Sequence, residues 1–142
     1  HLATIPIIIG IISALIIPRI CDNNNRIKIL SILFIIAIIA INLIKFSNQN
    51  IYILGLLLLG IATGSLLTLL FNHIAETKDI SFENMGFAGG LFFSITEIGG
   101  VLGPFSIGFI YDYTQNFNTA LSFYTAILLL TFFPLYLIRK LK

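Results

Sequence analysis

The fold is decided by the stretch Ile53-Leu54-Gly55-Leu56-Leu57-Leu58-Leu59, in which no polar residue alternates with the apolar ones. Strands of a membrane β-barrel show such alternation, so an α-helix is expected here. The apolar run extends outward to residues 51–74, and a membrane-spanning helix needs roughly 17–25 mostly apolar residues. Four further runs of this kind predict an all-α membrane protein with five transmembrane helices, at residues 2–20, 27–46, 51–74, 86–111 and 119–138.

The composition supports the same class of protein. The chain has 142 residues, of which 58% are hydrophobic and 10% are charged, and its mean hydropathy is +1.03. Soluble domains contain about 25% charged residues and cannot hide this much apolar surface at this size. The lipid bilayer is therefore the expected partner of most of the surface. A net charge of +2 without a basic run does not support nucleic-acid binding, and the single cysteine, Cys21, excludes an internal disulfide.

The lysines and arginines at the ends of the spans and between them predict how the chain is oriented. Counted over alternate connections and the C-terminal tail, they divide into groups of seven and one. The positive-inside rule places the larger group in the cytoplasm. We therefore expect a multi-pass integral protein of the cell (inner) membrane, with its N-terminus outside and its C-terminus in the cytoplasm. The cytoplasmic group comprises Arg19, Arg26, Lys28, Lys78, Arg139, Lys140 and Lys142, and the external residue is Lys45.

The number of spans indicates that the chain is part of a longer protein. Transporters are commonly built from repeats of three or six helices, and five spans do not fit that plan. The first span also begins almost at residue 1, without an interfacial anchor before it. We therefore expect a truncated chain.

Glycines are concentrated in two of the predicted helices. Gly60 and Gly64 form a GxxxG pair in the third span, a spacing that lets two helix backbones approach closely. The fourth span carries a denser set together with a proline, and such helices are where transporters bend or rock. Both sets are predicted to serve helix packing and hinge motion. The set in the fourth span includes Gly90, Gly99, Gly103, Pro104 and Gly108.

One acidic residue, Glu97, lies near the middle of the fourth span. A carboxylate at that depth costs roughly 2.5–3.5 kcal/mol, so it is expected to face protein or water rather than lipid. On a helical wheel it shares its face with small residues such as Gly90 and Gly100. Three interpretations stay open. Glu97 is a structural carboxyl group bonded to a neighbouring helix, for example through Thr63 or Thr68, or it is a proton-coupling site, or it contacts a substrate directly.

The sequence contains no arrangement of residues typical of an enzyme. No His, Cys, Asp and Glu residues have metal-ligand spacing, and no phosphate-binding loop or nucleophile elbow occurs. No catalytic residue, metal or cofactor is therefore predicted. An integral-membrane enzyme and a non-transporting multispan scaffold stay as alternatives to a transporter. The first lacks a catalytic set, and Glu97 in a Gly-Pro helix argues against the second.

The connection between the first two spans contains Asp22, Asn25 and Arg26, and with these residues it resembles a loop of the major facilitator superfamily. Asp22, Asn25 and Arg26 match the pattern G-x-x-x-D-R-x-G-R-[RK], which that family has between its second and third helices and, in degenerate form, between its eighth and ninth. Asn25 stands at the second glycine position, where Asn tolerates a left-handed conformation. Pro18 replaces the leading glycine and Asn23 the first arginine, as suits a degenerate copy.

Three later stretches are similar to the same family in the same order. Residues 59–76 resemble its tenth helix, which often ends in Ala-Glu, and residues 108–114 resemble the G-x-x-x-D-x-[TS] run at the end of its eleventh. Between them, a G-x8-G-x3-G-P spacing ending at Pro104 resembles a motif on the fifth helix of family antiporters, of which the eleventh is the pseudo-repeat. The resemblance therefore covers the whole chain as helices eight to twelve. It implies that residues 1–142 form an incomplete C-terminal transmembrane bundle, whose partner is the missing N-terminal half of the same protein.

The resemblance implies a secondary active transporter that moves a small solute by alternating access, by symport or antiport coupled to an ion or a proton. Two six-helix bundles would rock against each other around a site at the membrane midplane. The fourth span would lie along the seam between the bundles. The third span would line the cavity through Thr63, Ser65, Thr68 and Asn72. The first connection would form a cytoplasmic latch from Arg19, Asp22, Arg26 and Lys28.

Overall fold

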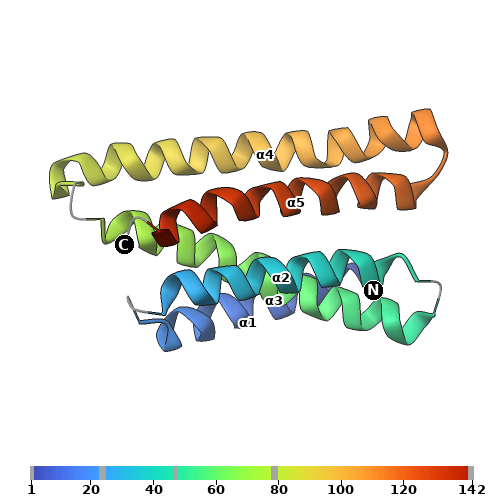
Figure 1. Ribbon diagram of the computed structural model, residues 1–142, viewed down its shortest axis with the longest axis horizontal. Coiled ribbons are helices and arrows are strands. Elements are labelled where there is room, and N and C mark those ends of the chain that lie inside the picture. The colour runs from blue at the N-terminus through green and yellow to red at the C-terminus, as the bar shows by residue number, and fades with distance from the viewer. Residues whose placement is uncertain (1, 23–24, 47, 78–79, 141–142) are drawn as a thin grey trace.

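The computed structural model describes residues 2–22, 25–46, 48–77 and 80–140, without the side chains at 82 and 132–140. In these ranges the chain is helical apart from short connections (Figure 1). Single 3₁₀ turns at Leu2–Thr4 and Phe82–Asn84 precede the first and fourth helices. The helices are α1 (Ile5–Ile20), α2 (Arg26–Ile44), α3 (Gln49–Ala75), α4 (Met85–Thr114) and α5 (Phe117–Lys140).

Each span predicted from the sequence coincides with one of these helices, and the bounds differ by less than one helical turn. The prediction of an all-α fold with five helices is therefore confirmed. Within the described residues, the stretches long and apolar enough to cross a membrane are Leu2–Ile20, Arg26–Ile44, Gln49–Ala75 and Met85–Thr114, and α5 adds the shorter apolar stretch Phe117–Thr131. Lys78 and Lys142 of the charge count, and Asn23 of the first connection, lie outside the described residues.

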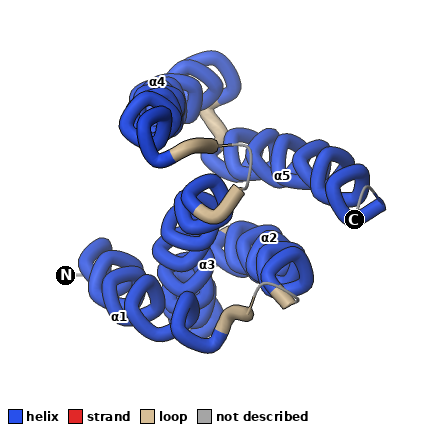
Figure 2. The backbone as a smooth tube through the Cα atoms, turned by 90° about the vertical axis from the view of Figure 1, so that its left-hand side faces the viewer, coloured by secondary structure: helices blue, strands red, loops and turns tan. Residues whose placement is uncertain are grey.

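Helix α3 lies at the centre of the bundle, with α1 and α2 packed on different sides of it (Figure 2). Leu30 and Leu33 of α2 meet Leu69 of α3 in a core where each is at most 2% exposed. The short connections make consecutive helices antiparallel, so the end of α3 returns to the level at which α2 begins. This arrangement brings the N-terminal end of α2 and the C-terminal end of α3 together at the predicted cytoplasmic side.

Helices α4 and α5 form a second antiparallel pair beside this core (Figure 1). Helix α4 ends where Gln115 adopts a left-handed conformation, with φ 51°, and its N–H donates to the carbonyl oxygen of Tyr111 at 2.7 Å. This is a common way to end a helix, because it satisfies a terminal carbonyl group. Helix α5 packs against both α2 and α4, whereas α4 meets α3 over a short stretch only.

Helix α4 is the most exposed of the long helices. Gly89 is the one buried residue among its 30 residues. Large apolar side chains such as Val101 and Phe105 are 71% and 69% exposed. Such a surface needs lipid or further helices to cover it, because water would solvate it poorly.

Candidate functional site

Helices α1 and α3 approach each other at glycines. A Cβ atom added to Gly60 would lie 2.6 Å from the carbonyl oxygen of Pro6, and one added to Gly64 would lie 2.7 Å from the Cα atom of Gly10. Real Cβ atoms essentially never come within 3.0 Å of such neighbours. The GxxxG pair of α3 therefore packs directly on the backbone of α1. This contact fixes the spacing of the two helices.

A buried serine adds polar contacts to the same interface. The hydroxyl group of Ser13, in α1, lies 3.0 Å from the carbonyl oxygen of Gly10 in its own helix and 3.3 Å from that of Ile61 in α3. Ser13 is 6% exposed, so its hydroxyl group depends on these carbonyl groups rather than on water. Small residues and a hydroxyl group thus hold α1 against α3, as is typical of helix contacts in membranes.

An open groove of about 440 Å³ follows the line where α1 and α3 meet. The hydroxyl groups of Thr63 and Thr68 donate to the carbonyl oxygens of Leu59 and Gly64 in their own helix, at 2.9 and 3.1 Å. Because these hydroxyl groups are already engaged, the groove presents mainly hydrocarbon and no charged group. It suits an uncharged, largely apolar part of a solute. Its walls include Pro6, Ile11 and Ala14 of α1 and Thr63, Leu67 and Thr68 of α3.

The other two residues predicted to line a cavity lie elsewhere on α3. Ser65 is 0% exposed, and its hydroxyl group has no hydrogen-bond partner among the described residues. Asn72 is partly buried and lies in the last turn of α3 before Ala75. The structure therefore brings Thr63 and Thr68 together in the groove and separates Ser65 and Asn72 from it.

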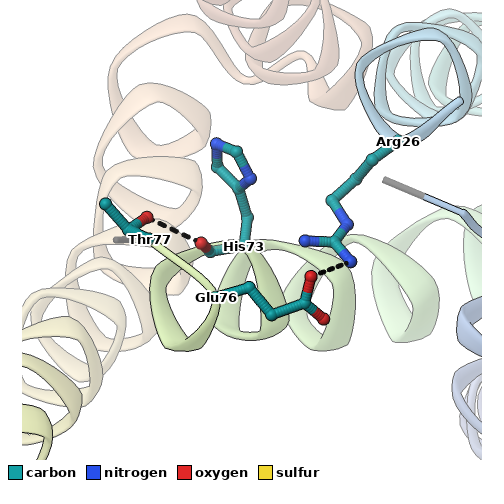
Figure 3. Close-up of polar contacts among 4 residues, drawn as sticks. All are labelled: Arg26, His73, Glu76 and Thr77. Carbon is teal, nitrogen blue, oxygen red and sulfur yellow. Dashed lines mark hydrogen bonds and ion pairs between the residues drawn. The ribbon is translucent and has the colours of Figure 1, made fainter. Parts of the chain in front are cut away.

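An ion pair joins the start of α2 to the end of α3. Figure 3 shows the guanidinium group of Arg26 reaching Glu76, with 2.7 Å between Nη2 and the carboxylate Oε2. The side chain of Arg26 is 7% exposed and that of Glu76 is 47% exposed. Within the described residues, Nε and Nη1 of Arg26 have no hydrogen-bond partner. The nearly buried guanidinium group of Arg26 is thus bound by one carboxylate group, that of Glu76. Thr77 closes the same end of α3 by donating to the carbonyl oxygen of His73 at 2.8 Å.

The other residues predicted for the latch do not share in this ion pair. Arg19, Asp22 and Lys28 are exposed, and the backbone carbonyl oxygen of Asp22 accepts a hydrogen bond from the N–H of Asn25 at 3.0 Å. The latch predicted from the sequence was confined to the first connection and did not include Glu76, which lies 50 residues after Arg26. The antiparallel arrangement was the available signal, because it puts the N-terminus of α2 beside the C-terminus of α3.

The carboxylate group of Glu97 lies on a side of α4 that no other described helix covers. It is exposed and has no hydrogen-bond partner among the described residues. Ile98, Val101 and Leu102 surround it in a shallow hollow of about 350 Å³. The structure does not bring Glu97 to Thr63 or Thr68, whose hydroxyl groups bond within α3.

The glycines of α4 divide into an uncovered set and two that touch another helix. A Cβ atom added to Gly103 would lie 3.7 Å from the hydroxyl oxygen of Tyr124, and one added to Gly89 would lie 3.5 Å from the ring of Phe71. The uncovered ones have nothing of the described chain within 4 Å of an added Cβ atom, and they are Gly86, Gly90, Gly99, Gly100 and Gly108. Most of the small-residue surface of α4 is therefore free to receive another helix.

Long apolar helices, packed through glycines and with a carboxylate on one of them, define a polytopic helical membrane protein. The chain belongs to the major facilitator superfamily, whose family profile matches residues 1–142. This confirms the resemblance seen in the loop and the glycine motifs, and it places the chain among transporters rather than enzymes.

A curated relative supports the same placement. The chain is 31% identical over 134 residues to the quinolone resistance transporter of Acinetobacter baumannii. The alignment covers 90% of this chain and 30% of that protein, so the chain spans less than a third of the relative's length. No solved structure matches the chain.

Proposed function

We propose that this chain forms helices eight to twelve of a secondary active transporter that exports an amphipathic solute by alternating access. The observation that carries the proposal is the uncovered face of α4, where Glu97 and a row of glycines lie on a predominantly apolar helix. A carboxylate on a spanning helix is costly in lipid, so protein or water has to cover this face. An N-terminal bundle would do so, with α4 along the seam between the two bundles.

The orientation within the membrane is part of the proposal. The excess of lysine and arginine in the first and third connections and in the tail supports a cytoplasmic C-terminus. The Arg26–Glu76 ion pair then lies at the cytoplasmic side. There it would tie α2 to α3 and act as a latch that favours one of the two access states. A bias of about 1–3 kcal/mol is enough to change the populations of such states substantially.

For the solute, we propose a planar, largely apolar molecule of the quinolone class. Two observations support this class: the name of the relative, a quinolone resistance transporter, and the uncharged wall of the groove between α1 and α3. The groove would hold the ring system, whereas charged parts of the solute would have to meet groups outside it, of which Glu97 is a candidate. An uncharged groove does not favour a small, highly charged solute, because the charge would lose water there without gaining a partner in the groove.

Filling the groove should weaken solute binding. In the complete protein, reconstituted in vesicles with an imposed pH gradient, we expect saturable uptake of a fluorescent quinolone. Leu67→Trp, which fills the groove, should raise the KM about tenfold, equivalent to ~1.4 kcal/mol of lost binding. Leu54→Trp is the matched control, because Leu54 lies on α3 outside the groove and is 49% exposed, against 45% for Leu67. Absence of quinolone uptake, or equal effects of the two variants, would contradict the proposed solute site.

Neutralising Glu97 should show whether this residue couples transport to the proton gradient or contacts the solute. If Glu97 carries the coupling proton, Glu97→Gln reduces gradient-driven transport to the level of empty vesicles, while exchange of labelled for unlabelled solute without a gradient continues. Glu83→Gln is the control, because Glu83 is exposed and lies in the connection before α4. Full gradient-driven transport in Glu97→Gln would rule out the coupling role. Loss of exchange as well would favour direct contact with the solute.

A further inference from the structure

Besides a ring contact between Tyr111 at its C-terminal end and Phe117 of α5, helix α4 is held to the rest of the described chain at two places along its length. Near its start, Gly89 faces the ring of Phe71, which also lies 5.8 and 5.2 Å from the ring centres of Phe92 and Phe93. Further along, Gly103 and Ser106 meet Tyr124 of α5. The first contact is between apolar groups, whereas the second is made of hydrogen bonds. Hydrogen bonds are directional, so the second contact can hold this part of α4 in a defined position.

The hydrogen bonds around Tyr124 form a compact cluster. Its hydroxyl group donates to the carbonyl oxygen of Gly103 at 2.7 Å and lies 2.6 Å from the hydroxyl oxygen of Ser106. The Ser106 hydroxyl in turn lies 2.7 Å from the carbonyl oxygen of Leu102 and 2.9 Å from that of Gly103. One side chain of α5 is thus bonded to a backbone group and a side-chain group within a single turn of α4.

This turn contains the weakest point of the α4 backbone. Pro104 has no N–H, so the carbonyl group of Gly100 loses its usual partner one turn earlier, and proline inside a helix permits a kink. Gly103, immediately before it, adds backbone freedom. The Tyr124 hydroxyl group therefore bonds α4 at the point where the helix bends most easily.

We propose that Tyr124 is a positioning residue, whose hydroxyl group holds the α4 backbone at Pro104 and serves as the pivot about which the two halves of α4 move during transport. The role is assigned to the hydroxyl group because both hydrogen bonds from Tyr124 to α4 involve its hydroxyl oxygen. The involvement in transport rests on the proposed function. The local control of the α4 backbone does not.

The test is amide hydrogen exchange of the complete protein in lipid nanodiscs. In Tyr124→Phe, the amides of residues 105–108 should exchange about fivefold faster, the factor expected for the loss of one net hydrogen bond that limits local opening. Tyr113→Phe is the matched control. It also removes a tyrosine hydroxyl group, near the end of α4, but the side chain of Tyr113 is 88% exposed. Ser106→Ala keeps the bond from Tyr124 to Gly103 and should therefore give a smaller increase than Tyr124→Phe.

Transport kinetics separate a pivot from a merely structural contact. In Tyr124→Phe, the kcat for solute transport should change several-fold while the KM stays within about twofold, because the variant alters a conformational step and leaves the groove intact. Unchanged exchange at residues 105–108 would overturn the pivot whatever the transport result. Faster exchange with normal kcat would limit Tyr124 to a structural contact. Faster exchange in a protein that transports no solute would contradict the proposed function and leave the local role of Tyr124 standing.

Discussion

Replacing Gly64 with alanine is expected to disrupt the contact between α1 and α3 and to prevent stable folding. The added Cβ atom would meet the carbonyl group and, at 2.7 Å, the Cα atom of Gly10. Overpacking in protein cores costs about 1–3 kcal/mol. We expect at least the upper end of this range, because the obstructing atoms belong to a backbone and cannot rotate away. The complete protein carrying Gly64→Ala should be recovered mainly as aggregate, or should unfold at a clearly lower temperature in detergent.

Gly89→Ala is the matched control for this change. Gly89 is likewise a glycine inside a helix, and it is buried, but an added Cβ atom would lie at an ordinary 3.5 Å from the ring of Phe71. Alanine also favours a helix over glycine by roughly 0.5–1 kcal/mol. Gly89→Ala should therefore leave the unfolding temperature unchanged or raise it slightly. Equal stability of the two variants would show that α1 and α3 do not touch at Gly64.

Removing the charge of Glu76 is expected to destabilise the predicted cytoplasmic ends of α2 and α3. Glu76→Gln leaves the nearly buried guanidinium group of Arg26 without an ionised partner. Breaking a buried ion pair on one side costs about 3–5 kcal/mol. We expect about 3 kcal/mol or less, because Glu76 is 47% exposed and water can replace part of the interaction. The unfolding temperature of the complete protein in detergent is the measurement.

A second variant distinguishes loss of the pair from loss of a side chain. Replacing both partners, as in Arg26→Leu combined with Glu76→Gln, removes the unpaired cation and should recover most of the lost stability. Glu83→Gln, at an exposed position, should have no effect. If the double variant is less stable than Glu76→Gln alone, the cation is not held by Glu76 in the membrane.

The helices could be predicted from the sequence because the length and apolar character of each run are enough to indicate a membrane-spanning helix. The run through Leu56 and Leu57 needs no partner to be recognised as a spanning helix, since lipid requires the backbone hydrogen bonds to be satisfied within the segment. The GxxxG pair likewise predicted a close helix contact. It could not predict the partner, because Gly10 and Pro6 lie in a helix whose own sequence carries no matching GxxxG pair.

The polar contacts between helices were beyond sequence reasoning for a different reason. Arg26 and Glu76 are far apart in the chain, and several acidic residues would have suited Arg26 equally well by charge. The bond from Tyr124 to Gly103 joins a side chain to a backbone carbonyl group, which leaves no signature in the residue types. Such contacts depend on the rotation of each helix about its axis, and uniformly apolar helices give little periodicity from which to read that rotation.

The central claim is that the uncovered face of α4, which carries Glu97, lies along the seam between the two helical bundles of a transporter. This face would be accessible from one side of the membrane at a time. Alkylation of Val101→Cys, beside Glu97, by a membrane-impermeant maleimide tests it most directly, in the complete protein with Cys21 and any other native cysteines replaced. Ile35→Cys on α2, 47% exposed, is the lipid-facing control. We predict that Val101→Cys is labelled from one side of the membrane, that a quinolone or a pH gradient changes the labelling rate, and that Ile35→Cys is labelled from neither side. A Val101→Cys that behaves like the control under all conditions would contradict the claim.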